Sequence, residues 1–142
     1  MQSLGERSLA KILIVEDNAL NIKVFCDLLA AHGHQPEGVL DSRLALDAAR
    51  SLKPDLVITD IQLPHITGLE LMEMIRKDEE LKDVPIMAVT AYSGVGDDER
   101  IRAAGAQAYV AKPISVVRFA ETVEVLLAGK NQLAQAPTPQ GA

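Results

Sequence analysis

Short apolar runs alternate with longer amphipathic segments along most of this chain. Four of the runs have the length and continuous hydrophobicity of strands buried on both faces of a sheet. They lie at residues 12–15, 56–59, Ile86–Thr90 and Ala108–Ala111. A weaker run, Gln35–Val39, contains a proline and a glycine, which are typical of an edge strand. The pattern therefore predicts five strands, one of them at an edge.

The segments between the strands carry helical spacing. Ile22, Phe25, Cys26 and Leu29 recur at i, i+3, i+4 and i+7, and Gly33 follows as a stop signal. Four further helices are expected, at 44–52, 69–77, Asp97–Ala104 and from Val116 onward. The first of them follows the N-cap candidates Asp41 and Ser42. The last carries an apolar stripe of Phe119, Ala120, Val123 and Leu127. The helix at 97–104 has only Ile101 as a large apolar residue, so we expect it to be marginal and mobile.

This alternation predicts an α/β fold with a parallel sheet, right-handed crossovers and helices on both faces. For five strands, the doubly wound, flavodoxin-like order 2-1-3-4-5 is the natural choice, with a ligand crevice between strands one and three. We expect one domain at residues 10–128, after a flexible N-terminus at 1–9. Residues 129–142, rich in Gly, Gln, Ala and Pro, suggest a disordered tail.

Composition narrows the class of protein. The 142 residues are 48% hydrophobic, enough for one domain with a real core, which must be aliphatic because aromatics make up only 3%. The net charge of −6 and the scattered basic residues argue against nucleic-acid binding. Cys26 is the only cysteine, which excludes an intrachain disulfide and favours a reducing compartment. With no secretory signal and no apolar run of membrane-spanning length, we expect a cytoplasmic protein without membrane insertion.

Asp60 ends the third apolar run and precedes the turn-forming segment 64–68. By itself it could be an ordinary turn or cap residue. Glu16 and Asp17, however, end the first run, Thr90 ends the fourth, and Lys112 ends the last. Since the carboxyl ends of parallel strands meet at one edge of a sheet, we expect these side chains to line one crevice.

The chemistry of this set indicates phosphoryl transfer. Neighbouring carboxylates repel one another unless a cation neutralises them, and a few hard oxygen ligands with room for water suit Mg²⁺. Asp60 would be the nucleophile toward phosphorus, while Lys112, the Thr90 hydroxyl and backbone N–H groups would stabilise the phosphoryl oxygens. Each residue also has an ordinary interpretation, as a solvated lysine, a strand threonine or a capping acid. Their joint spacing favours the functional interpretation.

Four motifs in order resemble the receiver domain of bacterial two-component response regulators. They are IVEDN at 14–18, TDIQLP at 59–64, VTA at 89–91 and AKP at 111–113. The resemblance covers about residues 10–128. Segments 13–21, 60–64 and 112–117 are similar in particular to stand-alone members of this family that act in the alphaproteobacterial cell cycle.

The resemblance implies a role for each site residue. Asp60 would accept a phosphoryl group from a sensor histidine kinase or a histidine phosphotransferase. Asp17 would bind Mg²⁺ directly, Glu16 directly or through water, and the Gln62 backbone carbonyl would complete the protein ligands together with Asp60. Lys112 would pair with the phosphoryl group.

The same resemblance implies a switch. The Lys112–Pro113 peptide bond would be cis, which only X-Pro bonds adopt readily. Thr90 would move toward the phosphoryl group with the loop 91–96, and Tyr109 would turn inward to fill the vacated space. The ordinary alternative for Tyr109 is packing in a core strand.

Output is then expected as a protein contact in trans, through the 96–128 face, with Arg100, Arg102 and Arg118 as candidate contacts. The protein would be a regulator rather than an enzyme, catalysing only its own phosphorylation and slow dephosphorylation. One role is an allosteric adaptor in cell-cycle or polarity control, placed at a cell pole by its partners. Others are an intermediate phosphate shuttle in a phosphorelay and a chemotaxis-type regulator.

Two other classes that share this type of sheet are weaker alternatives. A hydrolase of the haloacid dehalogenase type has a D-x-D pattern on its first strand, whereas Asp60 ends the third strand and Gln62 stands two residues later. A flavodoxin needs a phosphate loop rich in hydroxyls and glycine after the first strand, where this chain has acidic residues.

Overall fold

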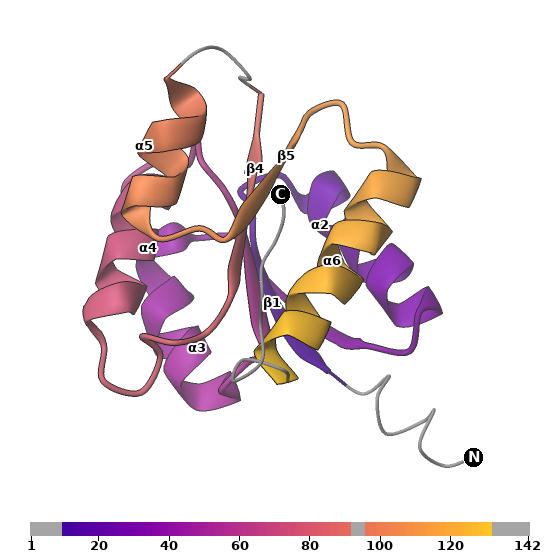
Figure 1. Ribbon diagram of the computed structural model, residues 1–142, viewed down its shortest axis with the longest axis horizontal. Coiled ribbons are helices and arrows are strands. Elements are labelled where there is room, and N and C mark those ends of the chain that lie inside the picture. The colour runs from indigo at the N-terminus through magenta and orange to yellow at the C-terminus, as the bar shows by residue number, and fades with distance from the viewer. Residues whose placement is uncertain (1–9, 92–95, 132–142) are drawn as a thin grey trace.

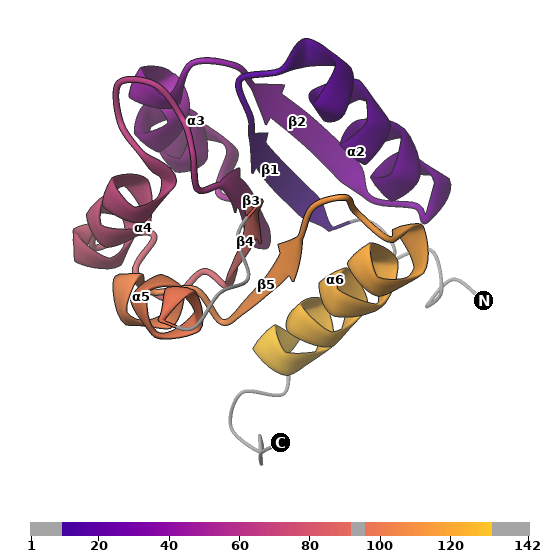
Figure 2. The same ribbon diagram turned by 90° about the horizontal axis from the view of Figure 1, so that it is seen from above.

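The computed structural model describes residues 10–91 and 96–131, which form a three-layer α/β sandwich (Figures 1 and 2). Its sheet has five parallel strands in the order β2-β1-β3-β4-β5, so the predicted order is confirmed. The weakest apolar run forms the edge strand β2, also as predicted. The strands are β1 (Lys11–Val15), β2 (Gln35–Val39), β3 (Leu56–Asp60), β4 (Ile86–Thr90) and β5 (Ala108–Ala111).

Helices cover both faces of the sheet, with α2 and α6 on one face and α3, α4 and α5 on the other (Figure 2). They are α2 (Ala19–Ala31), α3 (Ala45–Leu52), α4 (Gly68–Lys77), α5 (Asp97–Ala104) and α6 (Val116–Asn131). The segment 129–131 therefore belongs to α6 and not to the predicted tail, while the rest of the tail and the predicted N-terminus 1–9 lie outside the described residues.

Local capping explains where several helices begin. Asn18 caps α2 by accepting a hydrogen bond from the Asn21 amide. Thr67 and Glu70 form a reciprocal capping box at the start of α4. The helix predicted at 44–52 differs from expectation. It begins as a 3₁₀ turn, η1 (Ser42–Leu44), because the Asp41 side chain accepts from the amide two residues later and caps this turn.

Two clusters of buried apolar residues fill the spaces between the layers. Every residue of the central strands β3 and β4 is buried. On the α2–α6 side, Phe25 and Phe119 stack with ring centroids 5.1 Å apart and join the two helices. Cys26 packs against this cluster, and burial raises the pKa of its thiol, which agrees with the predicted packing role.

Arg76 on α4 connects separate segments of the chain on the face of the sheet covered by α3, α4 and α5. Its guanidinium donates to the carbonyls of Gly105 (2.6 Å from Nη2), Val84 (2.7 Å) and Lys82 (2.9 Å), and to the Gln107 side chain (3.0 Å). Partial burial lowers the pKa of the guanidinium from its ordinary value, and the four acceptors satisfy its donors. This residue therefore joins α4 to the segment before β4 and to the segment between α5 and β5.

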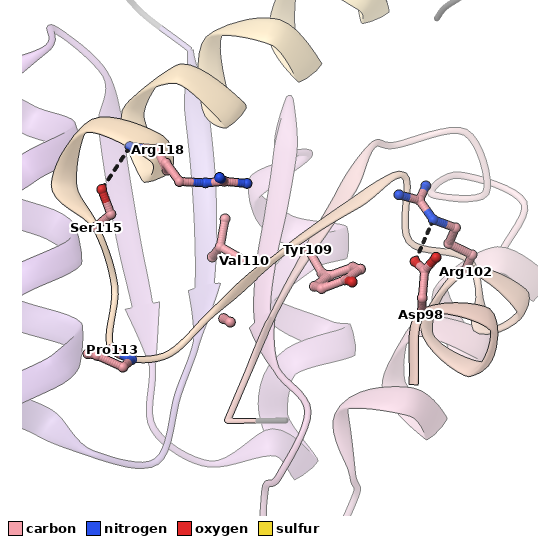
Figure 3. A pocket seen from close by; sticks show the side chains of 8 residues that line it. Asp98, Arg102, Tyr109, Val110, Pro113, Ser115 and Arg118 are labelled. Carbon is pink, nitrogen blue, oxygen red and sulfur yellow. Dashed lines mark hydrogen bonds and ion pairs between the residues drawn. The ribbon is translucent and has the colours of Figure 1, made fainter. Parts of the chain in front are cut away.

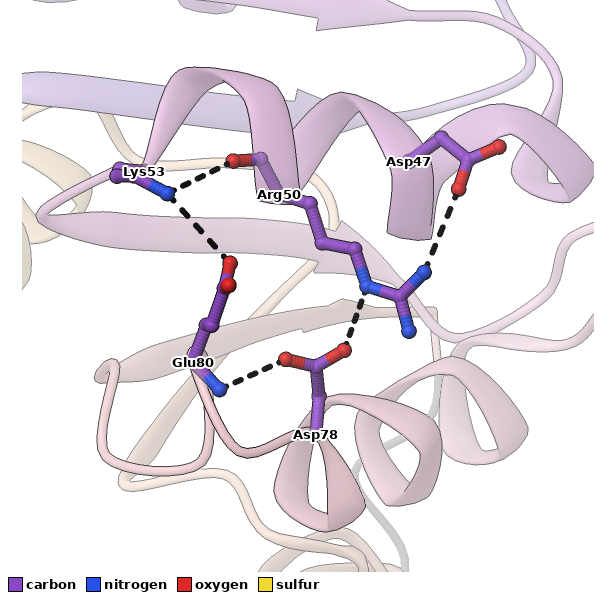
Figure 4. Close-up of polar contacts among 5 residues, drawn as sticks. All are labelled: Asp47, Arg50, Lys53, Asp78 and Glu80. Carbon is purple, nitrogen blue, oxygen red and sulfur yellow. Dashed lines mark hydrogen bonds and ion pairs between the residues drawn. The ribbon is translucent and has the colours of Figure 1, made fainter.

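A set of ion pairs connects α3 to the segment between α4 and β4, at the edge where the strands begin (Figure 4). Arg50 donates to Asp78 at 2.6 Å and lies 3.7 Å from Asp47. Lys53, whose positive φ of 54° ends α3, contacts Glu80 at 3.5 Å. These contacts lie far from the carboxyl ends of the strands. Their role is to join α3 to the segment that follows α4.

The short helix α5 is weakly anchored, as its sequence suggested. Only Ile101 and Ala104 are buried. Gly96 stands at its N-cap in a left-handed conformation and offers no side-chain cap. Ion pairs within the helix, from Arg100 to Asp97 and from Arg102 to Asp98, supply local support. Its mobility stays a prediction.

The described part of the chain contains no helix with the length and apolarity needed to cross a membrane.

Candidate functional site

The carboxyl ends of the central strands bring the predicted polar residues together. Asp60 ends β3, Glu16 follows β1, and Thr90 ends β4. Lys112 follows β5, where its amide donates to the Thr90 carbonyl at 2.8 Å. The Lys112–Pro113 peptide bond is cis, as the family resemblance implied. The result is one polar cluster at one edge of the sheet.

The Asp60 side chain is only 5% exposed, and hydrogen bonds hold its carboxylate from two sides. Oδ2 accepts from Lys112 Nζ at 2.6 Å, and Oδ1 accepts from the Gln62 backbone amide at 2.9 Å. Gly68 lies directly against the Asp60 carbonyl and the Ile61 Cα, where a Cβ would collide with backbone. Both oxygen atoms of the acid therefore have a fixed orientation.

Glu16 is the second buried acid of the cluster, with a side chain only 2% exposed. Its Oε2 accepts from the Asn18 amide at 3.1 Å. Its Oε1 lies 3.7 Å from Lys112 Nζ and finds no hydrogen-bond partner among the described residues. Burial first, and then the neighbouring Asp60 carboxylate, raises the pKa of Glu16 to about 7.

Lys112 lies between the two acids and remains partly exposed. Burial alone would lower the pKa of its ammonium group, but the hydrogen bond and the charge of Asp60, with smaller contributions from Glu16 and Asp17, raise it overall. The lysine is therefore a fixed positive charge beside Asp60. Asp17 itself is exposed at the rim of the cluster.

Residues 10–91 and 96–131 contain no group of three His, Cys, Asp or Glu side chains placed to hold a metal ion. The predicted carboxylates Glu16, Asp17 and Asp60 thus do not form a closed three-acid cage. The two buried acids do leave one carboxylate oxygen without a hydrogen bond, which suits a cation. Mg²⁺ commonly keeps several waters and uses one or two carboxylates, so this donor set fits it better than a metal that needs a complete protein shell.

The predicted switch residues Thr90 and Tyr109 lie on the neighbouring strands β4 and β5. Thr90 is buried at the end of β4, the strand paired with β3, with 1% exposure. Tyr109 is half-buried on β5 and lines a pocket of about 520 Å³ between α5 and the start of α6 (Figure 3). Arg102 and Arg118 line the same pocket, so this part of the predicted 96–128 face is concave and polar.

Ser42 contributes to the site in a way that the sequence analysis missed. Of the two predicted N-cap candidates, Asp41 does cap the 3₁₀ turn, so only the interpretation of Ser42 as a cap was wrong. Instead, the buried Ser42 hydroxyl donates to the Pro64 carbonyl at 2.9 Å and accepts from the Ile66 amide at 3.2 Å. These partners lie 22 and 24 residues away, so no local pattern could have indicated them.

Comparison with known proteins agrees with this geometry. The family of response regulator receiver domains matches residues 12–124, and the chain belongs to this family. Among curated relatives, the polar-differentiation response regulator DivK of Brucella anthropi is 48% identical over 116 residues, which cover 82% of this chain and 94% of the relative. DivK of Brucella ovis is 49% identical over the same lengths. The predicted family is thereby confirmed, and these relatives are polar-differentiation regulators within it.

Solved structures of the family are similar over most of the fold. The chemotaxis protein CheY4 of Vibrio cholerae has a TM-score of 0.79 at 26% identity, covering 83% of this chain and 98% of that one. The receiver domain of a sensor histidine kinase from Pseudomonas aeruginosa, which carries a magnesium ion coordinated in its active site cleft, has a TM-score of 0.78 at 31% identity. It covers 84% of this chain and 98% of that one.

Proposed function

We propose that Asp60 accepts a phosphoryl group, in the presence of Mg²⁺, from a phosphohistidine of a sensor kinase or phosphotransferase. The observation that carries this proposal is the buried Asp60 carboxylate, oriented by Lys112 at 2.6 Å and by the Gln62 amide at 2.9 Å. A carboxylate held in this way is a positioned nucleophile. The receiver family and the magnesium-containing relative support the same chemistry.

In the transfer step an Asp60 oxygen forms a bond to phosphorus while the P–N bond to the donor imidazole breaks. The electron pair of that bond returns to the imidazole nitrogen, so the product is an acyl phosphate. Lys112 then pairs with a phosphoryl oxygen, and the Thr90 hydroxyl donates to another. Asp17, Asp60 and the Gln62 carbonyl would hold Mg²⁺, with Glu16 acting directly or through water, and the ion would neutralise the acids and the incoming phosphate.

Phosphorylation adds a charge of about −1.5 to −2 at neutral pH. We propose that this charge attracts Thr90 and that Tyr109 turns into the vacated space, which changes the pocket on the 96–128 face. The phosphorylated protein would then act by contact with another protein, in cell-cycle or polarity control as the DivK relatives suggest. A phosphate shuttle is the second candidate.

Intact mass after incubation with acetyl phosphate and Mg²⁺ tests the acceptor. We expect one phosphoryl adduct in the wild type and in Asp47→Asn, whose side chain is 84% exposed and pairs with Arg50 on α3. The adduct should be absent in EDTA and in Asp60→Asn. An adduct that persists in Asp60→Asn would contradict the proposal.

A second experiment separates the adaptor from the shuttle. The phosphorylated protein is mixed with a histidine phosphotransferase, and with a histidine kinase whose activity is measured. Efficient transfer to the phosphotransferase supports the shuttle, whereas altered kinase activity without transfer supports the adaptor.

A further inference from the structure

The Ser42 hydroxyl bridges the two ends of a strained segment in the loop that follows Asp60. The two bonds of its hydroxyl go to the residues on either side of His65, one to the Pro64 carbonyl and one from the Ile66 amide. His65 has a positive φ of 69°, which a non-glycine residue rarely adopts. Because Ser42 is only 2% exposed, water cannot easily replace either bond. The hydroxyl therefore holds His65 in this conformation.

The same loop orients the Asp60 carboxylate. At its start, the Ile61 amide donates to the Val89 carbonyl at 3.0 Å, and the Gln62 amide donates to Asp60 Oδ1. At its end, the Gly68 amide donates to the Ile61 carbonyl at 2.9 Å. Both ends are thus fixed to the sheet and to α4. Between them, the two bonds of Ser42 supply an anchor from a different part of the chain.

We infer that Ser42 is a positioning residue for the Asp60 site. It holds the loop that carries Gln62, and through Gln62 it sets both the orientation of the Asp60 carboxylate and the place of the backbone carbonyl proposed to hold Mg²⁺. Serine suits this place because one small hydroxyl can donate and accept at once. The inference rests on the proposed function, since it concerns the same site.

Ser42→Ala tests the inference, with Ser51→Ala as the matched control. Ser51 is exposed near the end of α3, so its variant makes the same chemical change outside η1 and the loop. Both variants are titrated with Mg²⁺ alone while ¹⁵N-amide shifts are recorded, and hydrogen exchange of the Gln62 and Ile66 amides is measured without metal.

We expect Ser42→Ala to raise the apparent Kd for Mg²⁺ about tenfold, because the loss of a group that supports metal ligands commonly weakens binding by at least this factor. Exchange at Gln62 and Ile66 should accelerate while the amides of β1 keep their protection. Ser51→Ala should keep the wild-type Kd. An unchanged Kd in Ser42→Ala, or the same loss in Ser51→Ala, would overturn the inference.

The acetyl phosphate experiment separates this inference from the proposed function. If the wild type binds Mg²⁺ but forms no adduct, the proposed function fails, while a weakened Kd in Ser42→Ala still supports the positioning role. If the adduct forms and Ser42→Ala binds Mg²⁺ normally, the positioning role alone is wrong. A wild type that binds no Mg²⁺ would overturn both.

Discussion

Glu16 should make the stability of this protein depend on pH in the absence of Mg²⁺. Its carboxyl is buried beside Asp60, and the pKa of Glu16 rises from 4.5 to about 7. Between these two values the folded protein holds a proton that the unfolded chain has lost. The free energy of unfolding must therefore fall as the pH rises through this window. Glu16→Gln removes the titrating group while keeping the size and one acceptor oxygen.

The expected size of the effect follows from the shift. With a pKa of 4.5 in the unfolded chain and about 7 in the folded one, the contribution of Glu16 decreases by about 2.5 kcal/mol between about pH 5 and pH 8. Near pH 5 the wild type and Glu16→Gln should have similar stability. Near pH 8 the variant should be the more stable one by about this amount.

Urea unfolding followed by circular dichroism, in EDTA and at the two pH values, measures this difference. Glu73→Gln is the matched control, because Glu73 is an exposed acid on α4. Its pH dependence should equal that of the wild type. Saturating Mg²⁺ should also stabilise the wild type at the higher pH, since the ion binds the folded acids. If the wild type and Glu16→Gln lose stability in parallel from the lower to the higher pH, Glu16 is ionised in the folded protein and the burial argument is wrong.

Two further predictions concern residues that hold neighbouring segments of the fold together. Arg76→Met should lower the free energy of unfolding by about 3 kcal/mol, because two part-buried carbonyls lose a charged donor, whereas the exposed neighbour Lys77→Met should have little effect in the same urea titration. Gly68→Ala should cost about 3 kcal/mol and slow adduct formation, because the new Cβ would collide with the Asp60 backbone. In contrast, Gly129→Ala, where a Cβ meets open space in α6, should stabilise by up to about 1 kcal/mol. Equal stability of the two alanine variants would refute the packing argument.

Much of the fold could be predicted because its signals are local. Strands buried on both faces must be continuous apolar runs, and helices between them must show a regular apolar stripe. The order of the strands is one that doubly wound sheets of five strands commonly have. The edge strand β2 was recognisable because Pro36 and Gly38 do not suit a central position.

The site could be predicted only as far as strand ends determine it. Glu16 and Asp17 are adjacent acids, and the sequence alone does not say that the first is buried and the second exposed. That difference depends on how β1 meets the loop beyond it. The role of Ser42 depends on a loop more than twenty residues away, so it was assigned to the nearest helix instead. Contacts of this kind need the tertiary structure.

The two ends of α5 are held very differently. The carbonyl of Gly105, which follows the C-terminus of α5, accepts hydrogen bonds from Arg76. Gly96, at the N-terminus of α5, has no side chain that could cap the helix. A helix anchored at one end can rotate about that end. If Thr90 moves on phosphorylation, as proposed, we expect the N-terminal end of α5 to be displaced most and the end near Gly105 least.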